Sequence, residues 1–416
     1  NCPCGTCRTS SVCAAGTDII IIMIDQTREF IDSNADGDVR RLALQAARYP
    51  DVDMPVALDQ IAGRQTARGK LPSWAAIDGI VYPPHLSMEQ CSSEFTARYK
   101  ARVAARIAGS VRERLVDLTG GFGIDFSFMS RCFDEAVYVE MQERLCDGAR
   151  HNFRLLGMNN TEVVCGDGTD FLHTLDHSSL VFLDPARRDA NGEKTVAISD
   201  CMPDVLVIKD ELLNKSGHVM LKLSPMLDWH KAVVDIGSVS ELHIVSVANE
   251  CKELLLVLSK SYAGELHVYC VNDGTVFDYT ETACPDVVPV APEVTAGAYL
   301  YEPNASIMKA GCFSRLCETY HVRALGNNSH LFVSPDKIDG FPGRGFHVNA
   351  VSTMNKKELK KNISGMAKAN VAVRNFPMSA DDLRKRLKLG DGGSIYIFAT
   401  TAGERNHILL ICEKWK

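Results

Sequence analysis

One short stretch constrains the fold more than any other part of the chain: residues 116–125, which read Val-Asp-Leu-Thr-Gly-Gly-Phe-Gly-Ile-Asp. The apolar residues that lead into it are typical of the end of a buried strand, and residues 126–130 are typical of the start of a helix. A strand, a glycine turn and a helix in this order form a nucleotide-binding type of unit, because glycine lets a ligand approach the bare backbone. The stretch therefore predicts an α/β domain built around this turn.

The residues of the turn discriminate between two cofactors. Asp117, Gly121 and Gly123 form an Asp-x-x-x-Gly-x-Gly motif, whereas the third glycine of the nicotinamide fingerprint is replaced by Phe126. A helix N-terminus that binds pyrophosphate has no carboxylate beside it. Asp117 would repel phosphate and attract a cation, so S-adenosylmethionine, with its ammonium and sulfonium groups, fits better than NAD. Taken alone, the turn is explained equally well by cofactor binding and by a plain tight turn.

Three further apolar segments are each followed by an acidic residue. Glu140, Asp167 and Asp184 come after residues 137–139, 163–165 and 180–183. For any single acid, a helix cap or a solvated strand end is the better interpretation. Together with Asp117 they place four acids at the carboxyl ends of predicted parallel strands. Ligands of open α/β sheets bind at that edge, so the set predicts a ligand site.

With these motifs, residues 109–260 resemble the class I S-adenosylmethionine-dependent methyltransferases. The helix from Glu94, the Asp117 loop and residues 149–152 are similar to the trimethylguanosine synthase type of RNA methyltransferase. The whole chain resembles bacterial methyltransferases with a C-terminal THUMP-like domain. The resemblance implies S-adenosyl-L-methionine as cofactor, no metal, and the following cofactor-binding residues: Asp117, Thr119, Gly121, Phe122, Gly123, Glu140, Asp167, Gly168, and Gln90 and Ser93 from a segment that folds over the methionine part.

The resemblance also implies a role for the acidic strand ends. Asp117 would lie beside the methionine part, Glu140 would bind the ribose hydroxyls, and Asp167 would bind the adenine amine. Asp184 and Pro185 would lie where the methyl acceptor meets the sulfonium. Plain helix capping explains Ser93 as well as a cofactor contact does.

The candidate catalytic residues are Asp184, Pro185 and Arg187. Arg187 and Arg188 suit a phosphate clamp or base stacking, and pairing with nearby acids explains them equally well. Amino-group methyltransferases have an aromatic residue after Asp/Asn-Pro-Pro, whereas this chain continues from Asp-Pro with Ala186 and two arginines, which argues against an exocyclic amine as acceptor. Methylation at C5 of a pyrimidine needs a cysteine nucleophile, and no such motif occurs. Weaker candidates at the end of the fifth strand are Lys222 and Ser224.

Charge is distributed unevenly over the 416 residues, whose net charge is −7. Residues 341–416 contain 14 Lys and Arg against 6 Asp and Glu, so this part carries +8 and the remaining 340 residues carry −15. A basic module on an acidic body predicts an RNA partner, and a solvated helix face is the alternative. Fifteen scattered cysteines favour a reducing cytoplasm over a disulfide framework. No apolar run approaches the roughly 20 residues of a membrane span.

The pattern of apolar residues and turns predicts five parts. They are a non-native or disordered extension (1–22), a helical region (23–108), a Rossmann-like methyltransferase core (109–260), a small ferredoxin-like α+β domain (261–338) and a basic THUMP-like domain (339–416). The extension contains closely spaced cysteines that could suggest a zinc site, namely Cys2, Cys4, Cys7 and Cys13. No second pair or histidine cluster follows at finger spacing, so we favour a non-native extension over a metal site. We also expect a single helix over 38–49, a single helix over 306–317, and a hairpin of 242–247 with 253–258.

Three functions from different classes remain open from the sequence. The first is an enzyme that methylates a base in structured RNA, either tRNA or rRNA, with a small molecule or a protein as the alternative acceptor. The second is a nicotinamide-dependent oxidoreductase, which the missing third glycine and Asp117 disfavour. The third is a non-catalytic RNA-binding protein on a methyltransferase fold. Binding of the cofactor separates the first from the second, and methyl transfer to RNA separates the first from the third.

Overall fold

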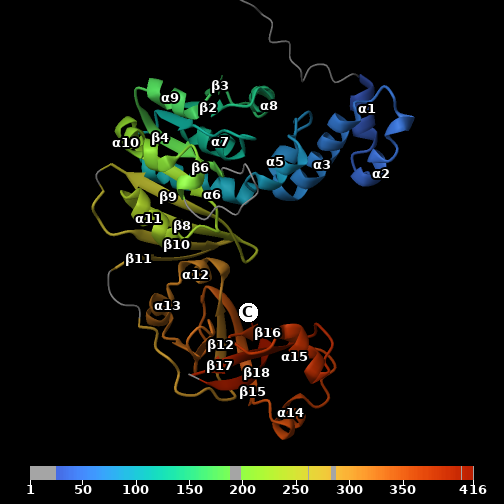
Figure 1. Ribbon diagram of the computed structural model, residues 1–416, viewed down its shortest axis with the longest axis vertical. Helices are drawn as coiled ribbons and strands as arrows, with labels where there is room; N and C mark the ends of the chain where they lie inside the picture. The colour runs from blue at the N-terminus through green and yellow to red at the C-terminus, as the bar shows by residue number, and fades with distance from the viewer. Residues whose placement is uncertain (1–24, 188–197, 261, 283–286, 404, 416) are drawn as a thin grey trace, which may run out of the picture. The chain divides into compact units, whose positions relative to one another are not determined.

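The computed structural model describes residues 25–187, 198–260, 262–282, 287–403 and 405–415 (Figure 1). The cysteine-rich residues 1–22 and Arg188 lie outside this range. The chain divides into two compact units, which are Asn1–Lys222 with Val234–Gly237 and Leu258–Lys260, and Leu223–Val233 with Ser238–Val257 and Ser261–Lys416.

The first unit begins with the predicted helical region. Its elements are α1 (Asp25–Ser33), α2 (Val39–Ala43), η1 (Ala46–Arg48), α3 (Met54–Lys70), α4 (Pro72–Ala75), α5 (His85–Gln90) and α6 (Glu94–Ala108). The single helix expected over 38–49 is wrong, because the chain forms the short α2 and then the separate turn η1. Only Leu42 of α2 is buried and η1 buries no residue, so no continuous apolar face holds a longer helix together.

A parallel sheet follows in the same unit, and its helices lie against it (Figure 1). Its five long strands have the spatial order β7-β4-β1-β2-β3. The elements are β1 (Arg114–Asp117), α7 (Ile124–Met129), η2 (Ser130–Cys132), β2 (Glu135–Glu140), α8 (Glu143–Leu155), β3 (Thr161–Cys165), α9 (Gly168–Thr174), β4 (Ser178–Leu183), β5 (Ala186–Arg187), η3 (Ile198–Asp200), β6 (Cys201–Met202), α10 (Val205–Lys215) and β7 (Ser216–Leu223). The predicted alternation of strand and helix is confirmed.

The strand register explains where the site forms. β1 runs parallel to both neighbours, with Asp117 opposite Tyr138 of β2 and Phe182 of β4. β3 is parallel to β2 as well, so the four predicted acids, which lie at or just after the carboxyl ends of these strands, share one edge of the sheet. The interiors of β1, β2 and β4 are mostly apolar and buried, as Leu115 and Val116 illustrate with no exposed surface.

The second unit contains the remaining strands, α11 (Trp229–Ile236), which divides between the units, and four helices. The elements are β8 (Val239–Val247), β9 (Glu250–Ser259), β10 (His267–Asn272), β11 (Thr275–Thr280), β12 (Tyr299–Pro303), α12 (Ala305–Ala310), α13 (Phe313–Tyr320), β13 (Arg323–Ala324), β14 (Phe332–Ser334), β15 (Gly343–Ser352), α14 (Lys356–Ile363), β16 (Asn370–Arg374), α15 (Ala380–Leu387), β17 (Ile395–Ala402) and β18 (Asn406–Lys414). β8 and β9 are neighbours, as the predicted hairpin requires. The single helix expected over 306–317 is wrong, because Gly311, at φ 73°, ends α12.

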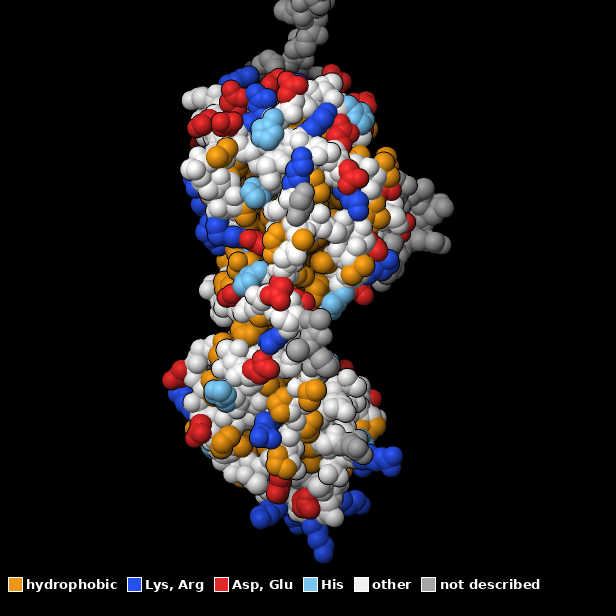
Figure 2. Space-filling view, turned by 90° about the vertical axis from the view of Figure 1, so that its left-hand side faces the viewer, with side chains coloured by type: hydrophobic (Ala, Val, Ile, Leu, Met, Phe, Trp, Pro, Cys, Tyr) orange, Lys and Arg blue, Asp and Glu red, His pale blue; other side chains and the backbone are white. Residues whose placement is uncertain are grey.

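The C-terminal part of this unit is a mixed sheet of seven strands, with the order β13-β14-β12-β15-β18-β17-β16. One face of it packs around Phe346, Phe398 and Leu410, and α15 packs on the other through Leu383. The lysines of α14 (Lys356, Lys357, Lys360 and Lys361) are all exposed. Figure 2 shows Lys and Arg side chains gathered at the lower part of this unit. Within the described part of the chain, no helix combines the length and the apolar character that crossing a membrane requires.

Candidate active site

The glycine turn after β1 has the backbone that the motif predicts. Gly121 and Gly123 have φ of 55° and 82°, in the left-handed region that glycine adopts without strain. A Cβ on Gly120 would lie 2.2 Å from the ring of Tyr138. The hydroxyl of Tyr138 donates to the carbonyl oxygen of Gly121 at 2.5 Å. The turn is therefore packed closely against β2, and its backbone is held in place by a buried aromatic side chain.

Asp117 ends β1 as a buried carboxyl group with few partners. Its Oδ1 accepts from the backbone N–H of Thr119 at 2.9 Å and lies 3.4 Å from the Thr119 hydroxyl. No described residue donates to Oδ2. Burial, and then the charges of Asp125 and Asp184, raise the pKa of Asp117 from 3.8 to about 8, although the Thr119 N–H opposes the shift. A cationic group placed at Oδ2 would stabilise the ionised form.

The raised pKa of Asp117 predicts a pH-dependent stability of the protein without cofactor. The folded protein retains the proton up to about pH 8, whereas the unfolded chain loses it near 3.8, so this group's contribution to stability is present below pH 3.8 and is lost as pH rises to 8. The Asp117→Asn variant has no carboxyl group here to ionise, so it does not lose stability in this way as the pH rises. We expect its melting temperature to exceed that of the wild type by several degrees at pH 9 and to approach it at pH 5. The same difference in melting temperature between variant and wild type at pH 5 and at pH 9 would contradict a raised pKa for Asp117.

The second and third acids bind backbone N–H groups at the same edge. Glu140 accepts from Gly121 N at 2.9 Å through Oε2 and from Gln142 N at 2.8 Å through Oε1. Asp167 caps α9, because its Oδ1 accepts from Thr169 N at 2.7 Å and from Asp170 N. Each carboxylate retains lone pairs for a hydroxyl or an amine.

Gly168, which follows Asp167, is required by close packing. A Cβ at this position would lie 2.2 Å from the carbonyl oxygen of Leu118. The start of α9 therefore lies directly against the residue after Asp117. This contact brings Asp167, which follows β3, close to the glycine turn.

Asp184 forms hydrogen bonds both with the glycine turn and with β7. Its backbone N–H donates to the Thr119 hydroxyl oxygen at 2.6 Å, and its Oδ2 accepts from Lys222 Nζ at 2.5 Å. Thr119 thus contacts both Asp117 and Asp184. Pro185 is buried, and the backbone of Arg187 pairs in β5 with Cys201. The structure describes neither the Arg187 side chain nor Arg188.

Sequence reasoning missed a buried ionic cluster beside this site. Asp125, in the first turn of α7, has Lys100 Nζ 3.2 Å from Oδ1, and its Oδ2 accepts from the Ser92 hydroxyl at 2.7 Å. Lys222 Nζ lies 3.7 Å from the same Oδ2. Burial alone would raise the pKa of Asp125, but the ammonium groups of Lys100 and Lys222 and the Ser92 hydroxyl hold it below its ordinary value. The cluster connects α6, α7 and β7 at the edge where the acids lie.

The sequence did contain a signal for this cluster. Lys100 lies three residues after Ala97 and three before Val103, so helical periodicity places it on the buried face of α6. A lysine on an apolar face requires a buried acid as its partner. Asp125 lies within the motif of residues 116–125, but no pattern in the sequence links it to Lys100.

Removing the ammonium of Lys100 should destabilise the protein strongly. Lys100 is fully buried, so Lys100→Met leaves Asp125 with less compensation in a desolvated place. We expect a loss of about 3–5 kcal/mol in the free energy of unfolding by urea denaturation. Combining it with Asp125→Asn should recover much of the loss, whereas Arg102→Met, an exposed change on the same helix, should cost under about 1 kcal/mol. A small loss for Lys100→Met would contradict the importance of the pair.

The N-terminal segment contacts the glycine turn and the helix that follows it. Phe122 packs edge-on against Trp74, with ring centroids 5.1 Å apart. Ser93 caps α6 by accepting from Thr96 N at 3.2 Å, and its neighbour Ser92 is the residue that reaches Asp125. Gln90 is exposed at the end of α5. Trp74, Tyr82, Ser92 and Lys100 are therefore among the residues of this segment that contact the turn and its helix, and the cofactor contacts of Gln90 and Ser93 stay predictions.

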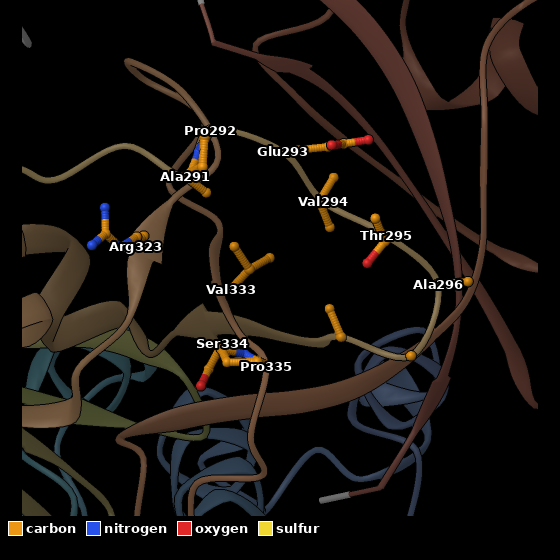
Figure 3. A pocket seen from close by; sticks show the side chains of 12 residues that line it. Ala291, Pro292, Glu293, Val294, Thr295, Ala296, Arg323, Val333, Ser334 and Pro335 are labelled. Carbon is orange, nitrogen blue, oxygen red and sulfur yellow. The ribbon is translucent and has the colours of Figure 1, made fainter.

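A separate pocket of about 450 Å³ lies in the second unit (Figure 3). It is lined mostly by small or apolar residues, with Arg323 and Glu293 as the charged side chains. None of its lining residues belongs to the predicted site. One charged residue of each sign does not match the set of carboxylates at the strand ends that the sequence predicts to bind a cationic cofactor.

Known proteins match both C-terminal domains separately, and one solved structure matches nearly the whole chain. A ferredoxin-like domain matches residues 299–342, and a THUMP domain-like model matches residues 343–414. The crystal structure of a "putative methyltransferase" from Porphyromonas gingivalis W83 superposes with a TM-score of 0.81 and 31% identity, covering 94% of this chain and 98% of that one. The chain belongs to this methyltransferase family, which carries a THUMP-like C-terminal domain.

Two other solved methyltransferases each match less than half of this chain. An S-adenosylmethionine-dependent methyltransferase from Agrobacterium tumefaciens is 13% identical, with a TM-score of 0.30 over 40% of this chain and 61% of that one. An rRNA methylase from Streptococcus thermophilus is 15% identical, with a TM-score of 0.29 over 38% of this chain and 95% of that one. No curated protein matches the sequence. The predicted fold class, a Rossmann-like core with ferredoxin-like and THUMP-like domains, is confirmed.

Proposed function

We propose that the protein is an S-adenosylmethionine-dependent methyltransferase that methylates a base in structured RNA, either tRNA or rRNA. The observation that carries the cofactor assignment is Asp117, a buried carboxyl group whose pKa is raised by burial and by the charges of Asp125 and Asp184, and whose Oδ2 has no donor among the described residues. The ionised carboxylate would repel a phosphate, whereas the ammonium of the methionine part would stabilise the ionised form.

The other strand ends suit the remaining parts of this cofactor. Glu140 retains lone pairs for two ribose hydroxyls, and Oδ2 of Asp167 remains for an exocyclic amine. Gly121 leaves its backbone bare, since a Cβ there would meet only the carbonyl oxygen of Thr119 at 3.7 Å. The donor set therefore fits S-adenosylmethionine, whose sulfonium supplies the methyl group when it is bound.

Asp184 is the residue that we assign to alignment of the methyl acceptor. Lys222 and the Thr119 hydroxyl fix its carboxylate and its backbone N–H. The carboxylate is less buried than Asp117, so an incoming polar group can donate to the oxygen that does not bind Lys222. Holding the acceptor in line with the sulfonium carbon is the main contribution that a protein makes to such a displacement.

The THUMP domain-like match and the exposed lysines of α14 support RNA as the substrate. Lys356, Lys357, Lys360 and Lys361 place four positive charges on one helix of eight residues. Phosphate contacts release counterions, so the affinity for RNA should fall steeply as salt increases.

Replacing these four lysines tests the RNA assignment. We expect the variant Lys356→Gln, Lys357→Gln, Lys360→Gln, Lys361→Gln to bind bulk tRNA at least tenfold more weakly and with a smaller salt slope, while its cofactor affinity is unchanged. The control is Arg40→Gln with Arg41→Gln on α2, two exposed cations outside the basic module. RNA affinity and salt slope equal to those of the wild type would remove α14 from the RNA interface.

A further inference from the structure

Glu302 of β12 forms the centre of a charge cluster in the second unit. Its side chain is only 7% exposed. Arg344, at the start of β15, donates to Oε2 from Nε at 2.8 Å and also from Nη2. Arg374, the last residue of β16, donates from Nη2 to Oε1 at 2.7 Å. One buried carboxylate thus fixes two guanidinium groups, one on each oxygen.

Both arginines retain hydrogen-bonding capacity toward solvent. A guanidinium has five N–H groups. Arg344 uses two on Glu302, and Arg374 uses one on Glu302 and one on the carbonyl oxygen of Val373. Each arginine side chain is 41% exposed. The cluster has a net charge of +1 and presents two oriented cations beside one another.

The seven-stranded sheet brings Glu302, Arg344 and Arg374 together. In the order of the sheet, β12 and β16 are separated by β15, β18 and β17. The two ends of the whole sheet nevertheless meet. Gly326, just after β13, bridges to Gly403, which follows β17, and the side chain of Asn375, which follows β16, donates to Asn327 O at 3.0 Å. Glu302 belongs to the ferredoxin-like segment, whereas both arginines belong to the THUMP-like segment. The arginine pair therefore exists only when the two segments are folded as one sheet.

We propose that Arg344 and Arg374, held in place by Glu302, bind a phosphate group of the RNA backbone. This inference rests on the proposed RNA substrate. A guanidinium donates two parallel hydrogen bonds to phosphate oxygens, and an arginine whose orientation is already fixed loses little conformational entropy on binding. The role of Glu302 is to position the two arginines, and it does not contact the RNA.

The sign of the effect of Glu302→Gln distinguishes this role from simple electrostatics. Removing a negative charge should strengthen binding of a polyanion if Glu302 acts only through its charge. If Glu302 positions the arginines, the variant should bind bulk tRNA about fivefold more weakly. Asp381→Asn is the matched control, because it also neutralises an acid paired with an arginine, Arg384, but on the exposed surface of α15. We expect no loss of affinity for this control.

Arginine variants complete the test. Arg344→Lys and Arg374→Lys keep the charge but lose the bidentate geometry, and each should weaken tRNA binding several-fold with melting temperatures near that of the wild type. These two variants carry the test if Glu302→Gln does not fold. Wild-type affinity in both lysine variants, or unchanged or tighter binding by a folded Glu302→Gln, would overturn the phosphate site while leaving RNA binding intact. A wild-type protein that binds no tRNA would overturn the proposed RNA substrate itself.

Discussion

The Asp184→Ala variant is expected to lose methyl transfer while it keeps its affinity for S-adenosylmethionine within a few fold. Asp184 contacts Lys222 through its side chain, but its backbone N–H, which bonds to Thr119, is unaffected by the substitution. The glycine turn and Asp117 therefore remain in place. Loss of acceptor alignment should lower the transfer rate by at least about 10²-fold. Single-turnover transfer of a labelled methyl group and calorimetric cofactor binding would be measured on the same preparation.

The control for this variant is Asp170→Ala, which removes an exposed acid on α9. It should have wild-type turnover. If Asp184→Ala retained turnover, the catalytic assignment would be wrong, and Lys222 would be the next residue to replace, since it lies between Asp184 and Asp125.

Replacing Asp117 with alanine is expected to weaken S-adenosylmethionine binding at least tenfold, or about 1.4 kcal/mol, because a charge-assisted contact with the ammonium is lost. The comparison is best made by titration calorimetry at pH 9, where the wild-type carboxyl, with its pKa of about 8, is ionised. Asp117→Asn should also lose affinity, even though it stabilises the free protein at that pH. Unchanged affinity in either variant would remove Asp117 from the cofactor site.

Much of the fold could be predicted because its signals are local. An apolar strand that ends in an acid, followed by a glycine turn, is visible in ten residues, and parallel strands bring such ends to one edge. The two wrong helices failed for local reasons too. No residue of η1 is fully buried, and Gly311 ends a helix that its neighbours would otherwise continue.

The cluster of Lys100, Asp125 and Ser92 could not be predicted as a unit, because its members come from separate parts of the chain. Lys100 and Asp125 meet only when α6 packs against α7. The same is true of Glu302, whose arginine partners lie 42 and 72 residues further along the chain. Periodicity shows that a charged residue is buried, but it does not show which partner neutralises it.

The seven-stranded sheet changes how the basic module should be tested. The sequence analysis predicts a separate domain over residues 339–416. In the structure, β15, β18, β17 and β16 of this part form one sheet with β12 and β14 of the preceding segment. Deleting the module would expose the edge of β12 and leave Glu302 without its arginines. Point substitutions that keep the sheet intact are therefore the better experiment.

The central claim is that this protein transfers a methyl group from S-adenosylmethionine to RNA. The most direct test incubates purified wild-type protein and Asp184→Ala with labelled S-adenosylmethionine and total RNA from a strain that lacks the gene. Labelled nucleosides are then identified by mass spectrometry. The account predicts one labelled nucleoside, formed by the wild type and absent with the variant. Cofactor binding without any label in RNA, or equal labelling by the variant, would contradict it.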